Sequence, residues 1–224
     1  MPATRVKVCG LTNEADLETA VDAGADAVGV ICDVPVDTPR EVSVERARDL
    51  VSSVPPFATT VLVTMASDPD RAVELVERVG PDAIQLHGDA DRDVLERLRS
   101  DTGVDVLLAI DSDEVAAAER YDRLVDGLLV DTVDESGGGG TGETHDWDRT
   151  KAAAADLESP LILAGGLTPE NVAEAVRTVE PFAVDVASGV EAEGGVKDPE
   201  AVRSFVDRAK NATQPTELEP EPEP

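Results

Sequence analysis

The chain repeats one pattern four times: AGADAVGV at residues 23–30, VGPDAIQL at 79–86, LVDGLLVD at 124–131 and VEPFAVDV at 179–186. Each copy starts with the end of a helix-like stretch, passes through a turn residue and becomes an apolar run typical of a strand. Such junctions occur where a helix leads into the next strand of a βα unit. Their repetition predicts a parallel sheet built from βα units.

Eight such units can be placed along the 224 residues. The candidate strands begin near Arg5, Asp26, Thr59, Asp82, Val104, Asp126, Pro160 and Phe182. Helix-like stretches follow them at residues 14–23, 44–54, 69–79, 92–100, 113–120, 148–156, 169–179 and 199–210. An open doubly wound sheet would also fit this alternation, but the even spacing favours closure. We therefore predict the α/β class and an eight-stranded parallel (βα)8 TIM barrel, formed by residues 1–210 as a single catalytic domain.

Two of the units carry extra residues, and both additions follow a strand. The first lies after the second strand, at about residues 32–42, and the other after the sixth strand, at about residues 132–146. In a TIM barrel the loops after the strands build the active-site face. Loop length therefore points to these two segments as places of function, although tolerated surface insertions would look the same.

The chain is strongly acidic, with 48 Asp and Glu against 19 Lys and Arg and a formal net charge of -29. Bulk electrostatics therefore exclude nucleic acid and anionic membrane surfaces as partners. The Pro-rich tail at 211–224 holds four Glu and no base, so most of the acidity belongs to the folded body, and we expect the tail to be disordered. We interpret the acidity as adaptation to a salt-rich cytoplasm, with an ordinary acidic protein as the alternative.

The sequence contains neither the pattern of a secretory signal nor an apolar run of about 18 residues, which predicts a cytoplasmic protein. Its two cysteines, Cys9 and Cys32, provide no disulfide framework, and both could be inert core residues. With two His and no cluster of Cys or carboxylates, we expect no metal site. The oligomeric state, monomer or homodimer, stays open.

Small residues follow the last two predicted strands. Gly165 and Gly166 precede a Thr-Pro pair suited to the start of a helix, and Ser188 and Gly189 follow the eighth strand. Such loops let backbone N–H groups approach a ligand, and TIM barrels often place a phosphate site there. A Gly-Gly pair alone often marks only a turn, but two such loops on adjacent strands predict a phosphate site.

Cys9 and Asp131 occupy equivalent places, at the carboxyl ends of the first and sixth strands. Closure would make strands six, seven, eight and one consecutive, so a ligand held by its phosphate would lie between these two side chains. A thiolate and a carboxylic acid form a base and acid suited to moving a proton within a sugar phosphate, which requires a lowered pKa for Cys9 and a raised pKa for Asp131. Each residue taken alone could equally be structural.

Four further side chains are candidates for the same region. Lys7 has the parity of Cys9 and would point into the barrel, where Asp185 on strand eight is a candidate partner for its charge. Arg40, in the first long loop, could clamp a substrate carboxylate or form a surface ion pair. His87, at the end of strand four, could hydrogen-bond a substrate or satisfy a loop carbonyl.

Seven segments occur in one order along the chain: KVCGLT at 7–12, DTPREVS at 37–43, IQLHG at 84–88, LLVDT at 128–132, GGGTGETHDW at 138–147, LAGGLTPENV at 163–172 and VDVASGVE at 184–191. Each is weak alone. In combination they resemble the motifs of the phosphoribosylanthranilate isomerases of tryptophan biosynthesis, over residues 5 to about 207.

The resemblance implies an Amadori rearrangement, without a cofactor, of N-(5-phosphoribosyl)anthranilate to 1-(2-carboxyphenylamino)-1-deoxyribulose 5-phosphate. It implies that Asp131 protonates the furanose oxygen and that Cys9 removes the proton from C2. Arg40 would hold the anthranilate carboxylate, and Asp185 would belong to the substrate pocket. The phosphate would be held by the backbone around Gly165, Gly166, Ser188 and Gly189. The implied partner is therefore a phosphorylated small molecule, and whether a second aminoaldose is accepted stays open.

Three positions depart from the family pattern. Thr38 replaces a serine, Glu143 replaces a lysine near the second long loop, and Cys32 replaces an aromatic residue, so the anthranilate ring would meet aliphatic side chains. Two other phosphate-binding barrels are alternatives: a thiamine-phosphate synthase would need Mg²⁺ and a diphosphate site, and an indole-glycerol-phosphate synthase a catalytic lysine. A non-catalytic protein that binds a phosphorylated ligand is the alternative from another class.

Overall fold

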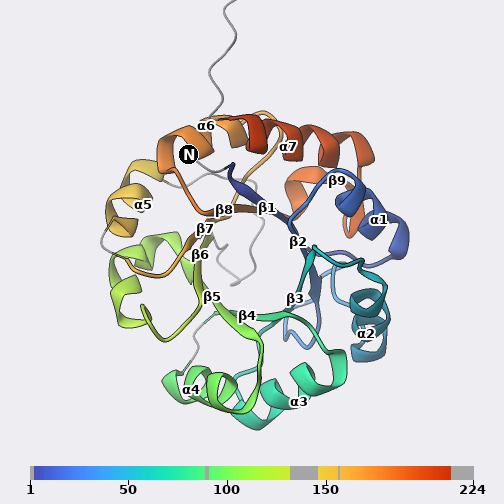
Figure 1. The fold of residues 1–224 in the computed structure, drawn as a ribbon, viewed down its shortest axis with the longest axis vertical. Coiled ribbons are helices and arrows are strands. Elements are labelled where there is room, and N and C mark those ends of the chain that lie inside the picture. Colours follow the sequence, from blue (N-terminus) through green and yellow to red (C-terminus); the bar gives the residue numbers. More distant parts are fainter. Residues whose placement is uncertain (1–2, 89–90, 132–145, 156, 213–224) are drawn as a thin grey trace, which may run out of the picture.

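The computed structural model describes residues 3–88, 91–131, 146–155 and 157–212. Eight parallel strands form a closed barrel in the order β1 to β8, and helices surround it (Figure 1). The predicted (βα)8 barrel is thereby confirmed. Residues 132–145 of the second long loop and the acidic tail from residue 213 lie outside the described residues.

The strands begin within one residue of the predicted positions. They are β1 (Arg5–Val8), β2 (Ala27–Ile31), β3 (Thr59–Thr64), β4 (Ala83–His87), β5 (Asp105–Asp111), β6 (Gly127–Asp131), β7 (Leu161–Leu163) and β8 (Ala183–Val186). The α-helices are α1 (Glu14–Asp22), α2 (Val44–Ser53), α3 (Pro69–Val79), α4 (Arg92–Asp101), α5 (Trp147–Ala154), α6 (Val172–Val179) and α7 (Pro199–Asn211). Two helices are of the 3-10 type, η1 (Ser112–Arg120) and η2 (Ser188–Val190), and β9 (Glu191–Glu193) pairs with β10 (Val196–Lys197) in an antiparallel hairpin.

Helix α6 starts later than the sequence predicts. The prediction has the helix begin at residue 169, whereas the structure begins it at Val172 with Asn171 as its N-cap. The Asn171 side chain accepts a hydrogen bond from the N–H of Thr168 (2.8 Å) and donates one to the carbonyl of Gly166 (2.9 Å). These bonds fold the segment after the two glycines into a turn, so the helix is displaced by about one turn.

The aspartate in three copies of the repeated junction connects neighbouring strands. It directly precedes β2, β4 or β6, and its carboxylate accepts a hydrogen bond from a backbone N–H of the preceding strand. The pairs are Asp26 with Val6 (2.9 Å), Asp82 with Thr60 (2.8 Å) and Asp126 with Val106 (2.9 Å). Each bond fixes the start of one strand against its neighbour, which explains why the same residue recurs in the sequence.

Two apolar zones surround the strands. The larger zone fills the space between the strands and the helices and includes fully buried side chains such as Leu75 and Phe205. The side chains that point inward form two smaller clusters, in which alanines such as Ala83 and Ala109 accompany larger residues such as Leu129 and Ile162. The small residues leave space inside the barrel for the polar side chains of the site described below.

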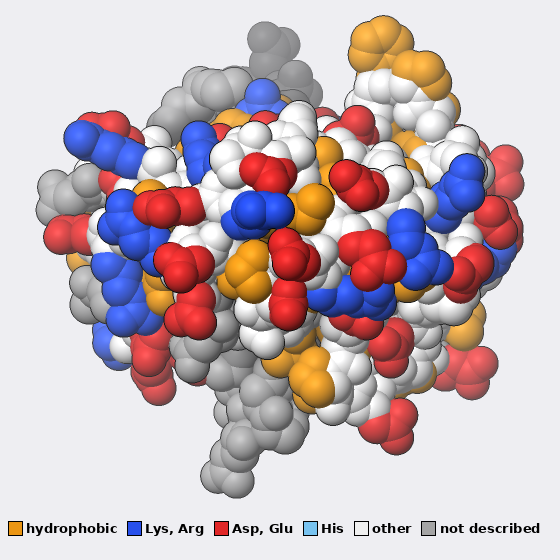
Figure 2. Space-filling model, turned by 90° about the horizontal axis from the view of Figure 1, so that it is seen from below, with side chains coloured by type: hydrophobic (Ala, Val, Ile, Leu, Met, Phe, Trp, Pro, Cys, Tyr) orange, Lys and Arg blue, Asp and Glu red, His pale blue; other side chains and the backbone are white. Residues whose placement is uncertain are grey.

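Charged side chains of both signs cover the helices. Figure 2 shows the face that carries α3 and α4, where acidic and basic side chains alternate. Ion pairs here join Arg71 to Glu74 (2.8 Å), Arg97 to Asp101 (2.6 Å) and Arg78 to Glu45 (2.6 Å). Because the chain has far more acids than bases, many carboxylates have no basic side chain to pair with. None of the described helices is long and apolar enough to cross a membrane.

We expect the excess of surface carboxylates to make folding depend on salt. Between about 0.1 M and about 1 M KCl the Debye length falls from about 10 Å to about 3 Å, which removes most of the repulsion between exposed acids. The midpoint of thermal unfolding, followed by circular dichroism, should rise by at least about 5 °C over this range. Sucrose in place of KCl is the control, and an unfolding midpoint that does not change with KCl would contradict the salt adaptation.

Candidate active site

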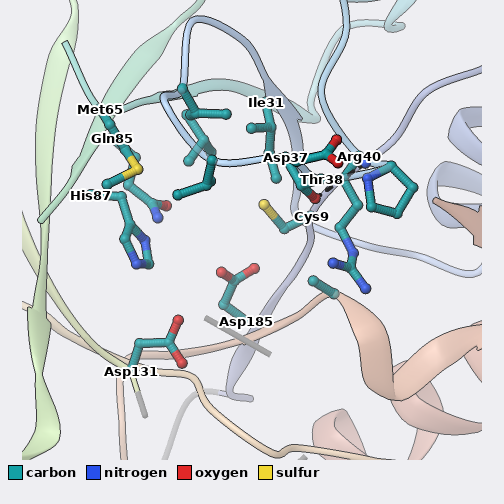
Figure 3. Close-up of a pocket in the computed structure, with 15 residues that line it drawn as sticks. Cys9, Ile31, Asp37, Thr38, Arg40, Met65, Gln85, His87, Asp131 and Asp185 are labelled. Carbon is teal, nitrogen blue, oxygen red and sulfur yellow. Dashed lines mark hydrogen bonds between the residues drawn. The ribbon is translucent and has the colours of Figure 1, made fainter. Parts of the chain in front are cut away.

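A pocket of about 270 Å³ opens at the carboxyl ends of the strands. Cys9, Asp131 and Asp185 line it and point toward its centre in Figure 3, and Arg40 and His87 lie on its walls. Three of these five residues lie on strands β4 (His87), β6 (Asp131) and β8 (Asp185), while Cys9 directly follows β1 and Arg40 lies in the loop after β2. The structure therefore brings together all the side chains that the sequence predicts for catalysis and substrate binding.

Cys9 follows β1 and is 5% exposed. Burial disfavours its charged form and raises the pKa of the thiol, while the nearby positive charges of Lys7 and Lys197 act in the opposite direction. A cysteine base requires a lowered pKa, and the residues around Cys9 do not by themselves provide that shift. The physical reason is the depth of the thiol in the barrel, which the position of Cys9 at a strand end does not reveal.

Lys7 and Asp185 form a buried ion pair inside the barrel, as the sequence predicts. They are opposite each other in the register of β1 and β8, and Nζ of Lys7 lies 2.8 Å from Oδ2 of Asp185. Burial alone would lower the pKa of Lys7, but the charges of Asp185 and Cys9 and hydrogen bonding to both together outweigh it, and the pKa is raised. Oδ1 of Asp185 is buried and has no hydrogen-bond partner among the described residues, so it can accept a hydrogen bond from a ligand in the pocket.

Arg40 is held in the pocket wall by a carboxylate from the β9–β10 hairpin. Its Nε and Nη2 donate to the two carboxylate oxygens of Glu191 at 2.8 Å and 2.7 Å, and the Arg40 side chain is 19% exposed. Lys197, fully buried, donates to Glu191 (2.7 Å) and to the carbonyl of Ala187 (3.0 Å). Two cations share one carboxylate, so this cluster has a net positive charge.

The sequence analysis missed Glu191 and Lys197 as members of the site. Glu191 ends the VDVASGVE segment, which is the only local signal for it, and Lys197 follows two glycines in a polar stretch. The β9–β10 hairpin that positions both residues has no alternating apolar pattern. Its place against the loop of Arg40 depends on contacts between segments about 150 residues apart, which local sequence patterns do not report.

Strand β4 supplies two polar side chains to the pocket. The pKa of His87 is lowered, first by burial and then by the charge of Lys7, so its imidazole is neutral at physiological pH. Gln85, which the sequence analysis did not select, also lines the pocket, and its buried Oε1 has no hydrogen-bond partner among the described residues. Both side chains can form hydrogen bonds with hydroxyl groups of a ligand.

The two small-residue loops lie against each other at the ends of β7 and β8. Gly165 and Gly166 have positive φ values of 81° and 61°, which favour glycine. A Cβ atom on Gly189 would overlap with the carbonyl oxygen of Leu167, so only glycine lets the loop after β8 approach the loop after β7 this closely. Ser188 starts η2 directly beside this contact. Among the described residues, no group of three or more His, Cys, Asp or Glu could hold a metal ion.

Comparison with known proteins identifies the family. The model of the family described as N-(5'phosphoribosyl)anthranilate (PRA) isomerase matches residues 6–208. The chain belongs to this family. The N-(5'-phosphoribosyl)anthranilate isomerase of the halophilic archaeon Haloferax volcanii is 60% identical over 93% of this chain and 94% of its own.

Solved structures of phosphoribosylanthranilate isomerases share the fold. The crystal structure of the enzyme from Thermotoga maritima has a TM-score of 0.83 at 36% identity and covers 93% of this chain and 99% of its own. A second structure, in complex with reduced 1-(o-carboxyphenylamino)-1-deoxyribulose 5-phosphate, has a TM-score of 0.81 at 33% identity with the same coverage. The predicted isomerase function in tryptophan biosynthesis is thereby confirmed, and the relative from a halophilic archaeon agrees with the interpretation of the acidic composition.

The contact of Gly189 with Leu167 predicts the effect of one methyl group. Gly189→Ala should lower the free energy of unfolding by about 1–3 kcal/mol, because the added carbon must displace backbone atoms. Gly103→Ala is the matched control, since a Cβ there meets no atom within 4 Å. It should leave stability unchanged or raise it by up to about 1 kcal/mol. Urea unfolding in high KCl measures both, and equal stabilities of the two variants would show that the loops are not packed as described.

Proposed function

We propose that Cys9 is the base and Asp131 the acid in the isomerisation of N-(5-phosphoribosyl)anthranilate to 1-(2-carboxyphenylamino)-1-deoxyribulose 5-phosphate. The observation that carries this assignment is that two residues 122 positions apart in sequence line the same pocket. Both side chains are held by the barrel wall, since Asp131 ends β6 and the N–H of Cys9, which directly follows β1, donates to the carbonyl of Val186 on β8 (2.8 Å).

The reaction requires proton transfers at two atoms that are both bonded to C1 of the ribose, the ring oxygen and C2, followed by a third proton transfer to C1. Asp131 gives its proton to the ring oxygen, the C1–O bond breaks, and the lone pair of the anthranilate nitrogen forms a C1=N bond. The Cys9 thiolate then takes the proton from C2, the C–H electron pair forms a C1=C2 bond, and the C=N pair returns to nitrogen. The resulting enolamine becomes the ketone by moving a proton from the C2 hydroxyl to C1, so no atom is gained or lost.

The surroundings of the pocket support one orientation of the substrate. The phosphate fits the backbone N–H groups of the two small-residue loops, around Gly165, Gly166, Ser188 and Gly189. The anthranilate carboxylate fits Arg40, whose cluster has a net positive charge. Asp185 and His87 are then beside the ribose, where they can bind its hydroxyl groups.

Aliphatic side chains surround the place that this orientation gives to the aromatic ring. The pocket wall near Arg40 contains Ile31, Val34, Val36 and Val63. Cys32, which replaces an aromatic residue of the family, is fully buried in the apolar zone between strands and helices and does not line the pocket. Glu143, the other notable departure from the family, lies outside the described residues.

Removing either proton-transfer group should abolish most of the activity. Cys9→Ser and Asp131→Asn should each lower kcat about 10²–10⁴-fold, the range for general acid or base catalysis. The measurement is the loss of anthranilate-type fluorescence after freshly generated phosphoribosylanthranilate is mixed with the protein in multimolar KCl. Cys32→Ala is the matched control and should keep the activity. Binding without turnover by the parent chain would instead favour the non-catalytic alternative.

The role assigned to Arg40 predicts a change in KM. Arg40→Met should raise KM about 10–100-fold, the equivalent of a lost charge-assisted hydrogen bond, with a smaller effect on kcat. Glu191→Gln should also raise KM, because it removes the negative charge that orients the guanidinium group of Arg40. Glu193→Gln, an exposed acid on the same hairpin, is the control. A KM that is unchanged in Arg40→Met would show that the carboxylate binds elsewhere.

A further inference from the structure

Lys7 lies two residues before the proposed base, and the reaction steps above do not use it. Lys7 is on β1 and Cys9 directly follows this strand in extended continuation, so both side chains point into the barrel. A Cβ atom placed on Gly29 of β2 would lie 2.8 Å from Sγ of Cys9 and 3.3 Å from Cε of Lys7. The thiol and the end of the lysine side chain therefore both border the space that this glycine leaves open.

A thiolate at the position of Cys9 requires a compensating positive charge. Cys9 is buried, and a charge moved out of water is costly unless a group of opposite sign lies close to it. Lys7 is equally buried and has the same requirement, which Asp185 meets at 2.8 Å. The ammonium group is thus placed between a permanent carboxylate and a sulfur that is charged in only one state.

We propose that Lys7 is a positioning residue that stabilises the thiolate form of Cys9, with its ammonium group shared between the Cys9 sulfur and Asp185. The proposal rests on the role of Cys9 as the base. Asp185 keeps Lys7 charged and fixed when the thiol is protonated. When the thiol loses its proton to solvent, Lys7 supplies the positive charge next to the sulfur. The thiolate then accepts the C2 proton of the substrate.

Other charged groups around Cys9 act on it from neighbouring elements. Asp185 on β8 opposes ionisation of the thiol, whereas Lys197 on β10 and Arg40 after β2 favour it. The nearby charges of Lys197 and Arg40 are already partly neutralised by Glu191. Lys7 is also the largest of the favourable influences on the pKa of the thiol, which agrees with its place beside the sulfur.

A purely structural role for Lys7 makes a different prediction. If Lys7 only neutralises Asp185, then replacing both by neutral side chains should leave the titration of Cys9 and the pH dependence of kcat unchanged. If Lys7 holds the thiolate, the same double variant should shift both to higher pH. The double variant also removes the risk that a single variant unfolds because it leaves one buried charge alone.

The test is the pH dependence of Cys9 alkylation by iodoacetamide, measured in a Cys32→Ala background so that only one thiol reacts. Lys7→Met should move the alkylation midpoint up by at least about one pH unit and lower the rate at pH 7 at least about tenfold. The double variant Lys7→Met with Asp185→Asn should move the midpoint up by less, because it also removes the opposing charge of Asp185. Lys7→Arg should keep the midpoint near that of the parent. Lys151→Met is the matched control, since it removes a lysine from an ion pair with Glu180 on the outer surface (2.9 Å).

The kcat profile of the same variants separates this proposal from the proposed function. The acid limb of kcat should move with the alkylation midpoint in the Lys7 variants. An unchanged midpoint in a folded double variant would overturn the role of Lys7, while Cys9 would remain the base if Cys9→Ser is inactive. Full activity of Cys9→Ser would instead overturn the proposed function, whatever the Lys7 variants show.

Discussion

The buried ion pair between Lys7 and Asp185 lies on the contact that closes the barrel. Strand β1 pairs with β8 in a register that sets these two residues opposite each other. Neither charge would be tolerated in the interior alone, so the pair favours this register over a shifted one. Closure in this register also makes β6, β7, β8 and β1 consecutive, which brings Cys9 and Asp131 to the two sides of the glycine loops.

The charge of the chain limits how it can attract an anionic substrate. With a net charge of -29 the surface repels anions. Salt that screens this repulsion would also weaken the attraction between an anionic substrate and any exposed basic side chain. Two of the four lysines, Lys7 and Lys197, are instead buried at the site and fixed by hydrogen bonds to carboxylates. Buried charges are screened much less by salt. The positive charge of the site is therefore placed where high salt affects it least.

The sequence predicts the strands well because their pattern is local. Alternating apolar runs and the recurring junction define where all eight strands start. The positions of Cys9 and Asp131 then follow, because both residues come where a predicted strand ends. The hairpin of Glu191 and Lys197 could not be predicted, since its polar residues gain their role only through contact with Arg40. The raised pKa of Cys9 was also beyond the sequence, because burial depth depends on the whole barrel. Residue type and strand parity, in contrast, were enough to predict the partner of Lys7.

The two ends of the barrel have different tasks, and the repeated junction lies at the end opposite the pocket. Aspartates at the amino ends of β2, β4 and β6 connect strands in pairs, so that end is fixed by side chains with no part in the pocket. The fourth copy has Phe182 in this place, and the guanidinium of Arg5 lies over its ring at 4.3 Å. This contact joins β8 to β1, the two strands that close the barrel. Because these contacts stabilise the amino ends, the carboxyl ends are free to carry the glycines with positive φ, the buried charges and the buried acceptors of the site.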